Sequence, residues 1–454
     1  MIGPIRRTLT LIVLSVRDML ASAGPVVLLA VGVLVGAYWW LDPQPPKTVT
    51  LATGPEGSAY AEFGRRYAQA LARNRIEVKL TTTEGSLANL QALRAGQADV
   101  AFVRGGSADA AADGEAGITS LGALFYEPLW VFYRPAALAA QARAAPKSEA
   151  NKPVTTLGQL KGLRVNIDQP GSGVPEIVQR LLQANGMDAS ALVTSQLPPA
   201  AAAEALLGGY LDALVLVTAP ESPVVERLLR APGVALMDVA QADAYARRFP
   251  FLQPVTLPRG VVDLAADIPP HDVSLLATTT SLLTREQTHP ALRQLFAQAA
   301  QGLHSGAGWF NRARDFPNTR TSELPVSPEG DRAINGTPPF WQRYLPFWAS
   351  NLLERMWLVI GGLIVLLLPL SRVVPPLYTF RVRRRVFRWY ARLRHIEAKV
   401  DEGLGERNQL LDELDELDRV ANGITVPLAH AEELFALRNN IDAVRRRLLA
   451  KRPA

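Results

Sequence analysis

The stretch that decides the fold is Thr48–Gly106, TVTLATGPEGSAYAEFGRRYAQALARNRIEVKLTTTEGSLANLQALRAGQADVAFVRGG. Its short β-branched runs lie at Thr48–Thr53, Ile76–Thr82 and Val100–Val103, and a helical segment separates each run from the next. This alternation is typical of right-handed units in which a helix connects two parallel strands. The stretch therefore predicts an α/β fold that contains a parallel sheet.

Two turns in this stretch each place glycine and serine just before a helix, at 54–58 (GPEGS) and 83–86 (TEGS). The first N–H groups of a helix have no partner within the helix, and the helix dipole makes this end partly positive. Two such ends at one edge of a sheet predict an anion-binding pocket. The candidate ligand-binding residues of these turns are Gly57, Ser58, Tyr60, Gly85, Ser86 and Asn89.

Each of these residues also has a purely structural interpretation. Ser58 and Ser86 are ordinary N-cap residues, Tyr60 fits a core position, and the Asn89 amide can close a capping arrangement. The turn at 54–58 is neither a dinucleotide fingerprint, since it lacks the final glycine, nor a P-loop, since it lacks the lysine.

The segment 156–217 repeats the alternation of helix and strand. It predicts a strand at Leu163–Ile167, a helix at Val174–Asn185 and a further strand at Leu211–Val217, which together form a second sheet. The turn between the first two elements adds three candidates that could close on the same anion, with a tight left-handed turn as the structural alternative. These candidates are Gly171, Ser172 and Gly173.

Arg104 follows the third strand, at the end where ligands bind in open α/β sheets. If it faces a cleft, its guanidinium can pair with a carboxylate, and if it faces solvent it is an ordinary surface arginine. Leu121–Arg134 has strand composition that Glu127-Pro128 interrupts. Of its side chains, Glu127, Trp130 and Tyr133 fit either a cleft wall or the core. The sequence also predicts a surface loop at 107–117 and a helix at 284–304.

The motifs GSAY at 57–60, EGSLANLQALRAGQADVAFV at 84–103 and LKGLRVNIDQPGSGV at 160–174 resemble the solute-binding receptors of the TAXI branch of TRAP transporters. The resemblance covers about 47–306 and implies a two-lobed, type II periplasmic binding protein fold. It implies lobe 1 at 47–130 with 258–310 and lobe 2 at 131–257. The implied ligand is a dicarboxylate, 2-oxo acid or acidic amino acid such as glutamate, delivered to TRAP-type membrane subunits. Arg104 departs from this family, which commonly has an uncharged polar residue there.

Composition excludes several function classes. The 454 residues carry a net charge of +6 and no cysteine, which excludes disulfides, thiolate metal sites and cysteine nucleophiles. The five histidines show no metal-ligand spacing, and neither GxSxG nor SxxK occurs. We therefore expect no enzyme activity, no cofactor and no nucleic-acid partner, with a hydrolase as a distant alternative.

Two apolar segments, 24–41 and 352–374, are long enough to cross a membrane. Arginines precede the first segment and follow the second, so the positive-inside rule predicts that 1–23 and 375–454 are cytoplasmic. The domain between the two segments is then expected on the periplasmic side of a bacterial inner membrane. The alternatives are a cleaved signal for the first segment and a buried core helix for the second. Aromatic residues that fit the outer interface are Trp39, Trp40, Trp341, Trp348 and Trp357.

The segment 311–350 is polar, contains repeated proline and glycine, and predicts a stalk or a cover over the domain. The tail shows apolar spacings of four and three, which predict two helices joined at the break 423–427. They form either an antiparallel hairpin or a coiled coil that makes a homo-oligomer. Because a simple transport receptor needs neither a second span nor such a tail, a sensor or scaffold that signals through the tail is the alternative function. The apolar positions are Leu410, Leu414, Leu417, Ala421 and Ile424, then Leu437, Ile441, Val444 and Leu448.

Overall fold

The computed structural model describes residues 23–142, 153–337, 340–424 and 431–450. The chain divides into two compact units, Gln44–Leu352 and a second unit made of Met1–Pro43 with Leu353–Ala454. Most of the predicted cytoplasmic N-terminus and most of the predicted break at 423–427 lie outside the described residues.

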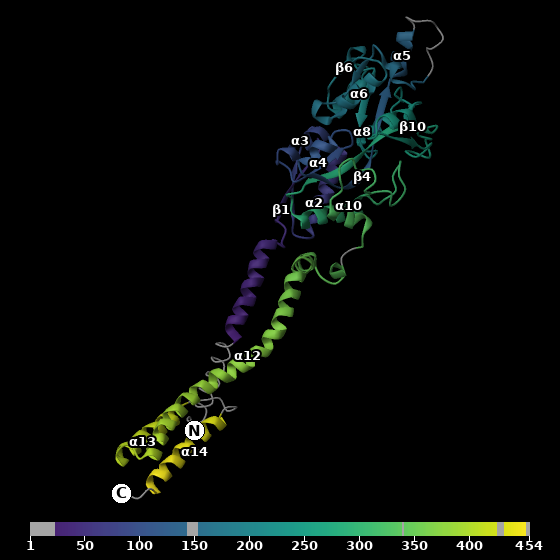
Figure 1. The fold of residues 1–454 in the computed structure, drawn as a ribbon. Coiled ribbons are helices and arrows are strands. Elements are labelled where there is room, and N and C mark those ends of the chain that lie inside the picture. Colours follow the sequence, from purple (N-terminus) through teal and green to yellow (C-terminus); the bar gives the residue numbers. More distant parts are fainter. Residues whose placement is uncertain (1–22, 143–152, 338–339, 425–430, 451–454) are drawn as a thin grey trace. The chain divides into compact units, whose positions relative to one another are not determined.

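The described part of the Gln44–Leu352 unit contains one mixed sheet of ten strands (Figure 1). The strands are β1 Thr48–Ala52, β2 Glu77–Thr81, β3 Val100–Arg104, β4 Ile118–Tyr133, β5 Arg164–Asn166, β6 Val193–Ser195, β7 Ala213–Val217, β8 Ala235–Leu236, β9 Gln253–Leu257 and β10 Val273–Arg285. Their order is β2-β1-β3-β10-β4-β7-β5-β6, with β9 beside β10 and β8 beside β4. As the alternating pattern predicts, β1 is parallel to β2 and β3, and β5 is parallel to β6 and β7. The prediction of a separate second sheet is wrong, because β4 pairs with both β10 and β7 and so joins the two parallel parts into one sheet.

Two long antiparallel strands, β4 and β10, join the halves of this sheet. Thr280–Thr284 of β10 pair with β3, and Val273–Ala277 pair with β9. β4 pairs with β10 and then, through Leu129–Tyr133, with β7. Because both strands run from one half into the other, we propose that the halves are the two predicted lobes, with lobe 1 at 47–130 and 258–310 and lobe 2 at 131–257.

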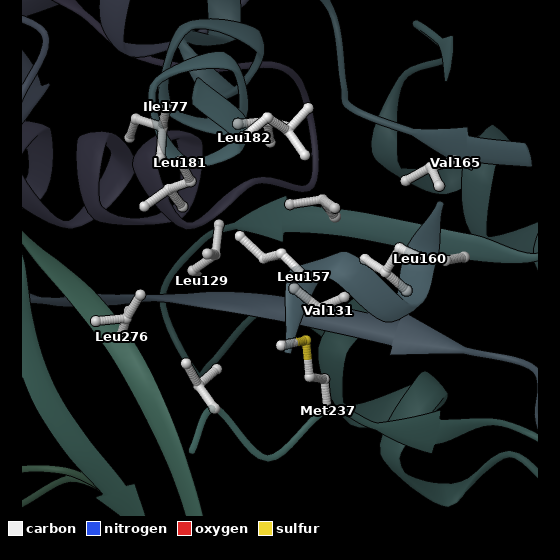
Figure 2. Close-up of a cluster of buried hydrophobic side chains, with 14 of the residues drawn as sticks. Leu129, Val131, Leu157, Leu160, Val165, Ile177, Leu181, Leu182, Met237 and Leu276 are labelled. Atoms are coloured by element: carbon white, nitrogen blue, oxygen red, sulfur yellow. The ribbon is translucent and has the colours of Figure 1, made fainter. Parts of the chain in front are cut away.

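Ten helices of this unit's described residues flank the sheet. They are α2 Ala59–Ala72, α3 Ser86–Arg94, α4 Ala110–Glu115, α5 Pro135–Ala142, α6 Val174–Ala184, α7 Pro199–Leu207, α8 Pro223–Arg230, α9 Ala242–Arg248, α10 Pro290–His304 and α11 Pro328–Asn335, with single 3₁₀ turns at η1 Leu157–Leu160, η2 Pro170–Ser172, η3 Ala189–Ala191 and η4 Phe340–Arg343. In lobe 1, Tyr67 of α2, Phe102 of β3 and Phe296 of α10 are buried in one core. The core of lobe 2 contains Val131 of β4 and side chains of α6 (Figure 2). Leu129 of β4 and Leu276 of β10, which lie within the bounds proposed for lobe 1, also belong to this core, so the two strands contribute to both cores. Packing of the helices on the sheet therefore fixes the loops at the strand ends.

The predicted loop at 107–117 is wrong at its centre, which forms α4. The Asp109 carboxylate caps this helix by accepting hydrogen bonds from the N–H groups of Ala111 and Ala112, both at 3.1 Å. Asp113 in the helix is buried and forms an ion pair with Arg94 at 2.6 Å. An N-cap and a tertiary ion pair thus stabilise a helix too short to show apolar periodicity.

Two other element boundaries differ from the predictions. The helix predicted at 284–304 begins only at Pro290, because Thr284 is still in β10 and donates from Oγ1 to the Asp99 carbonyl at 2.9 Å. β4 is continuous across Glu127-Pro128, where an interruption was predicted. A proline removes only its own N–H donor, so pairing continues on either side of it.

The segment after α10 returns to the sheet as a cover over lobe 1. Single bridges join Ser120 to Val326 and Ala123 to Asn318. Gly330 of α11 lies so close to β4 that an added Cβ would be 2.9 Å from the Leu121 carbonyl oxygen. This close approach admits no side chain larger than hydrogen.

We expect Gly330→Ala to lower the free energy of unfolding by about 1–3 kcal/mol, because the methyl group must push α11 away from the β4 backbone. Thermal unfolding of the full chain measures this. The matched control is Gly302→Ala, since a Cβ at Gly302 meets nothing within 4 Å and alanine favours a helix. Equal stability of Gly330→Ala and wild type would contradict the close packing.

Two helices are long and apolar enough to cross a membrane, Ala23–Leu41 and the Phe347–Phe380 part of α12 Phe347–Glu402. The first lies in the second unit, which also contains all of α12 from Leu353 onward. These are the only candidate spans among the described residues, and they include the two predicted segments. They are candidates by length and composition.

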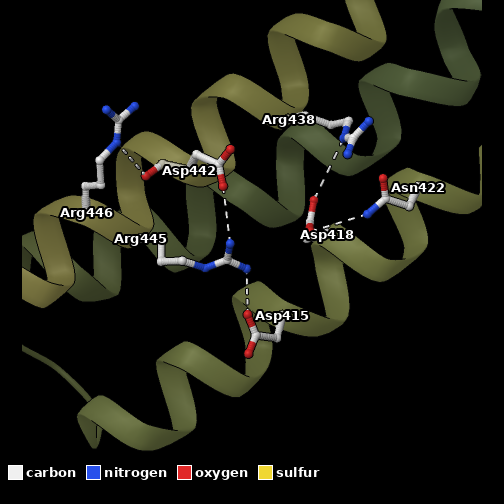
Figure 3. Close-up of polar contacts among 7 residues, drawn as sticks. All are labelled: Asp415, Asp418, Asn422, Arg438, Asp442, Arg445 and Arg446. Carbon is white, nitrogen blue, oxygen red and sulfur yellow. Dashed lines mark hydrogen bonds and ion pairs between the residues drawn. The ribbon is translucent and has the colours of Figure 1, made fainter.

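The C-terminal tail forms a bundle of three helices. Eight of the nine predicted apolar positions are buried together in α13 Arg407–Gly423 and α14 Ala431–Ala450, as the spacing predicts. The ninth, Ile424, follows α13 and is only partly buried against this cluster. The end of α12 joins them through Val386, Leu393, Ile396 and Val400, which the two-helix prediction missed. Arg445 of α14 pairs with Asp415 of α13 at 2.5 Å, and Arg438 pairs with Asp418 (Figure 3).

Candidate functional site

A cavity of about 300 Å³ lies at the strand ends where the two halves of the sheet meet. This is the edge at which open α/β sheets bind ligands. The lobe 1 residues that line it include Gly54–Tyr60, Glu84, Gly85, Arg104 and Glu127, and the lobe 2 residues include Asp168, Ser172, Pro198–Ala200, Leu216–Thr218 and Ser222–Val224.

Tyr60 and Glu127 form a buried hydrogen-bonded pair in the lobe 1 wall. The Tyr60 hydroxyl donates to Glu127 Oε2 at 3.0 Å and lies 3.3 Å from Thr280 Oγ1. Burial raises the pKa of the Glu127 carboxyl above its ordinary value, and nearby Arg104 acts against this shift. Burial, followed by the repulsion from Glu127, raises the pKa of Tyr60, so its hydroxyl keeps its proton and acts as a donor.

Arg104 is the charged centre of the cavity and is only 2% exposed. Its Nη2 donates to the Ser172 carbonyl oxygen at 2.8 Å, and its Nη1 lies 3.4 Å from the Val217 carbonyl oxygen. The buried Nε has no hydrogen-bond partner among the described residues. A buried cation bound by two neutral carbonyl groups keeps its charge available for an anionic group.

Asp168 is a cavity residue that the sequence analysis missed. It follows β5, is 7% exposed, and has a positive φ of 66°. Burial raises its pKa to about 6, and the N–H of Gln169, which donates at 2.8 Å, and the charge of Arg104 act against this shift. Strained backbone and a buried carboxylate together are typical of functional sites. The feature of the sequence that could have identified Asp168 is the position of an acidic residue between a predicted strand and a glycine-rich turn.

We expect Asp168→Asn to stabilise the ligand-free protein by up to about 3 kcal/mol at pH 7.5. The pKa of Asp168 is higher in the folded protein than in the unfolded chain, so between pH 4 and 6 the folded protein holds a proton that the unfolded chain has lost. Stability therefore falls as the pH rises through this range. Asparagine tolerates the positive φ and carries no charge. Unfolding by urea at pH 7.5 and pH 4 measures the effect, which should vanish at pH 4. A variant less stable than wild type at pH 7.5 would contradict this account.

Six of the ten predicted ligand-binding residues line the cavity, and four do not. Lining residues are Gly57, Ser58, Tyr60, Gly85, Arg104 and Ser172. Ser58 also caps α2, because its Oγ accepts from the Ala61 N–H at 3.2 Å. The predicted cap at Ser86 is wrong, because the N-cap residue of α3 is Gly85 and Ser86 is the first residue of the helix. The four that do not line it are Ser86, Asn89, Gly171 and Gly173.

These four residues position the cavity walls. Ser86 Oγ accepts from the Arg104 N–H at 2.8 Å, and the Asn89 amide donates to the Phe102 carbonyl oxygen at 2.8 Å. The Gly171 N–H donates to the Glu84 carboxylate at 3.0 Å. Gly173 has a φ of 78°, and an added Cβ would lie 2.9 Å from Arg104 Nη2. Glycine is therefore required beside the guanidinium.

The remaining strand candidates differ in their surroundings. Trp130 is fully buried and donates from Nε1 to the carbonyl oxygen of Thr218, which lines the cavity. Tyr133 is buried in the lobe 2 core. Within the described ranges, no group of three or more His, Cys, Asp or Glu side chains is arranged to hold a metal ion.

The segment that contains the cavity matches a known protein family. The model of the NMT1-like family matches residues 51–307, which run from β1 to beyond α10 and include every residue that lines the cavity. The chain belongs to the NMT1-like family. This membership covers the sheet and the cavity, while both candidate spans and the tail lie outside the matched residues.

Solved structures to which parts of this chain are similar include two ligand-binding proteins and a regulatory domain. The periplasmic aliphatic sulphonate binding protein SsuA from Escherichia coli is 17% identical, with 56% of this chain and 73% of that chain covered and a TM-score of 0.35. The alkanesulfonate-binding SsuA from Xanthomonas axonopodis is 16% identical (57% and 75%, TM-score 0.34). The CcmR regulatory domain from Synechocystis is 14% identical (57% and 98%, TM-score 0.37).

Proposed function

We propose that this NMT1-like protein is a membrane-anchored receptor that binds a small organic solute through an anionic group. The proposal depends on Arg104, which is a buried cation at the cavity between the lobes. The Nε atom of this residue has no hydrogen-bond partner among the described residues. A carboxylate or sulfonate of the solute would accept from this group, with Ser58 and Tyr60 as further hydroxyl contacts. The predicted dicarboxylates, 2-oxo acids and acidic amino acids are the first compounds to test.

Binding by lobe closure follows from the contacts that cross between the proposed lobes. Arg104 bonds to the Ser172 carbonyl group, Glu84 accepts from the Gly171 N–H, and Arg180 donates to the Gly106 carbonyl group at 3.3 Å. These contacts form only when the lobes are together. A solute that touches both lobes would shift the equilibrium toward this closed state, with β4 and β10 as the connecting strands.

The proposed location is the bacterial inner membrane, with the cavity on the periplasmic side and both termini in the cytoplasm. The support is the arginines that flank the two candidate spans. The proposed partner is a TRAP-type membrane subunit, which the motifs at 57–60 and 84–103 favour through their resemblance to TAXI receptors.

Thermal unfolding of the full chain in detergent, with and without succinate, 2-oxoglutarate, L-glutamate and L-leucine, tests the receptor function. A solute present at 100 times its dissociation constant stabilises the folded state by about 2.7 kcal/mol. We expect at least one compound to raise the melting temperature of wild type and to have no effect on Arg104→Met. No shift with any compound would contradict the proposal.

A second candidate function is a sensor that signals through the tail. The observation that favours it is the packed three-helix bundle of α12, α13 and α14, a domain that a transport receptor does not need. Its exposed surface would contact a cytoplasmic partner or a second copy of the chain. Crosslinking in cells with and without the solute distinguishes a sensor from a transport receptor. Only for a sensor do we expect a crosslink from the tail that depends on the solute.

A further inference from the structure

More acidic than basic residues line the cavity, and this excess of negative charge limits which solutes can bind. Arg104 is the one basic residue among the described lining residues, whereas four acidic residues line the same cavity. Glu127 and Asp168 are buried, and Glu56 and Glu84 are exposed. A dianion held at Arg104 would place its second negative charge among these carboxylates, which is electrostatically unfavourable.

We propose, on the basis of the proposed receptor function, that the solute is a small zwitterion whose anionic group binds Arg104 and whose protonated amine faces Asp168 and Glu127. Arg104 is 2% exposed and its Nε has no hydrogen-bond partner among the described residues, so this cation has a donor left for the anionic group of the solute. The apolar remainder of the solute contacts the lobe 2 wall. That wall consists of Pro198, Pro199, Leu216, Val217, Pro223 and Val224.

The sheet register places the lobe 1 charges on one face. Arg104 of β3 pairs with Thr280 of β10, and Thr278 of β10 pairs with Glu127 of β4. Directly paired residues and residues two apart point to the same face of a sheet. The Tyr60 hydroxyl lies between Thr280 and Glu127 and holds the Glu127 carboxylate in place.

Asp168 brings the second carboxylate from lobe 2. It precedes the turn whose Ser172 carbonyl group accepts from Arg104 Nη2. The charge of Arg104 acts on both carboxyl groups, yet the described residues contain no ion pair within 4.0 Å between Arg104 and either of them. The three charged groups thus surround the cavity without neutralising one another in contact, which suits a solute that carries both signs.

The apolar wall selects against an acidic or basic side chain on this zwitterion. An α-amino acid with a branched aliphatic side chain satisfies all three parts of the site and is small enough for a cavity of about 300 Å³. If the charged residues only held the turns together, binding would show no dependence on the amine of the solute.

Calorimetric titration of the full chain in detergent tests this inference with two matched triads. They are L-leucine, 4-methylpentanoate and 3-methylbutylamine, and L-valine, 3-methylbutanoate and 2-methylpropylamine, with succinate as the dianion. We expect an amino acid to bind, and removal of either charged group to weaken binding by about 30-fold or more. In Asp168→Asn the preference for the amino acid over its deaminated counterpart should fall to about 3-fold or less, whereas the exposed control Asp243→Asn should retain it.

The outcomes separate this inference from the receptor function. Binding of succinate or of a deaminated acid as tightly as the amino acid would overturn the zwitterion while leaving a receptor. An unchanged preference in Asp168→Asn would also overturn it. Binding of no compound in either panel would overturn the receptor function and the inference together.

Discussion

Replacing Arg104 with methionine should weaken solute binding by about 100-fold or more. Truncating one partner of a buried charge pair costs about 2–5 kcal/mol, which is about 30-fold to several thousand-fold in affinity. The substitution also removes the hydrogen bonds from the guanidinium to the Ser172 and Val217 carbonyl groups. Both the contact with the anion and the contact that holds the lobes together are therefore lost.

Calorimetry with the tightest-binding compound of the two panels measures this effect. Arg104→Lys is the second variant. It keeps the positive charge but lacks the planar guanidinium with its paired N–H donors, so it should retain part of the affinity. The matched control is Arg230→Met, since Arg230 is exposed, forms an ion pair with Asp263 at 3.6 Å, and does not line the cavity. Binding by Arg104→Met within a factor of three of wild type would show that Arg104 is structural.

Acid should destabilise the protein through His304, and His304→Phe should remove this sensitivity. His304 ends α10 in an aromatic cluster, with its ring centroid 4.5 Å from that of Phe63 and 5.4 Å from that of Phe125. Burial, followed by the charge of Arg66, lowers its pKa to about 3. Between pH 6.5 and 3 the unfolded chain binds a proton that the folded protein excludes, so stability falls as the pH falls. The loss is about 3 kcal/mol at pH 4.5 and about 5 kcal/mol at pH 3.

Urea unfolding of the full chain at pH 7.5 and pH 4.5 measures the difference between wild type and His304→Phe. A difference between variants is needed because Asp168 acts in the opposite direction over the same pH range. Phenylalanine fits the cluster and cannot titrate, whereas the exposed control His271→Phe should keep the acid sensitivity. The same loss of stability in His304→Phe as in wild type would contradict the buried neutral imidazole.

The alternation of helix and strand predicted the parallel parts of the sheet, because both follow from local apolar patterns. The position of Arg104 at the strand end was predicted for the same reason. The position of Asp168 depends on a backbone with positive φ, which no periodicity reveals. Ser86 and Asn89 were predicted to face a ligand, but neither lines the cavity, because they bond to the Arg104 N–H and the Phe102 carbonyl group of the neighbouring strand. Such tertiary partners become visible only in the folded chain.

The most direct test of the central claim, that the interlobe cavity binds a solute, is calorimetric titration of wild type and Ala200→Trp against both panels. Ala200 is exposed at the start of α7 and lines the cavity, so an indole there should fill the cavity without disturbing the core. We expect micromolar binding in wild type, about −8 kcal/mol, and no binding in the variant. Equal binding by the two proteins, or no binding by wild type, would contradict it.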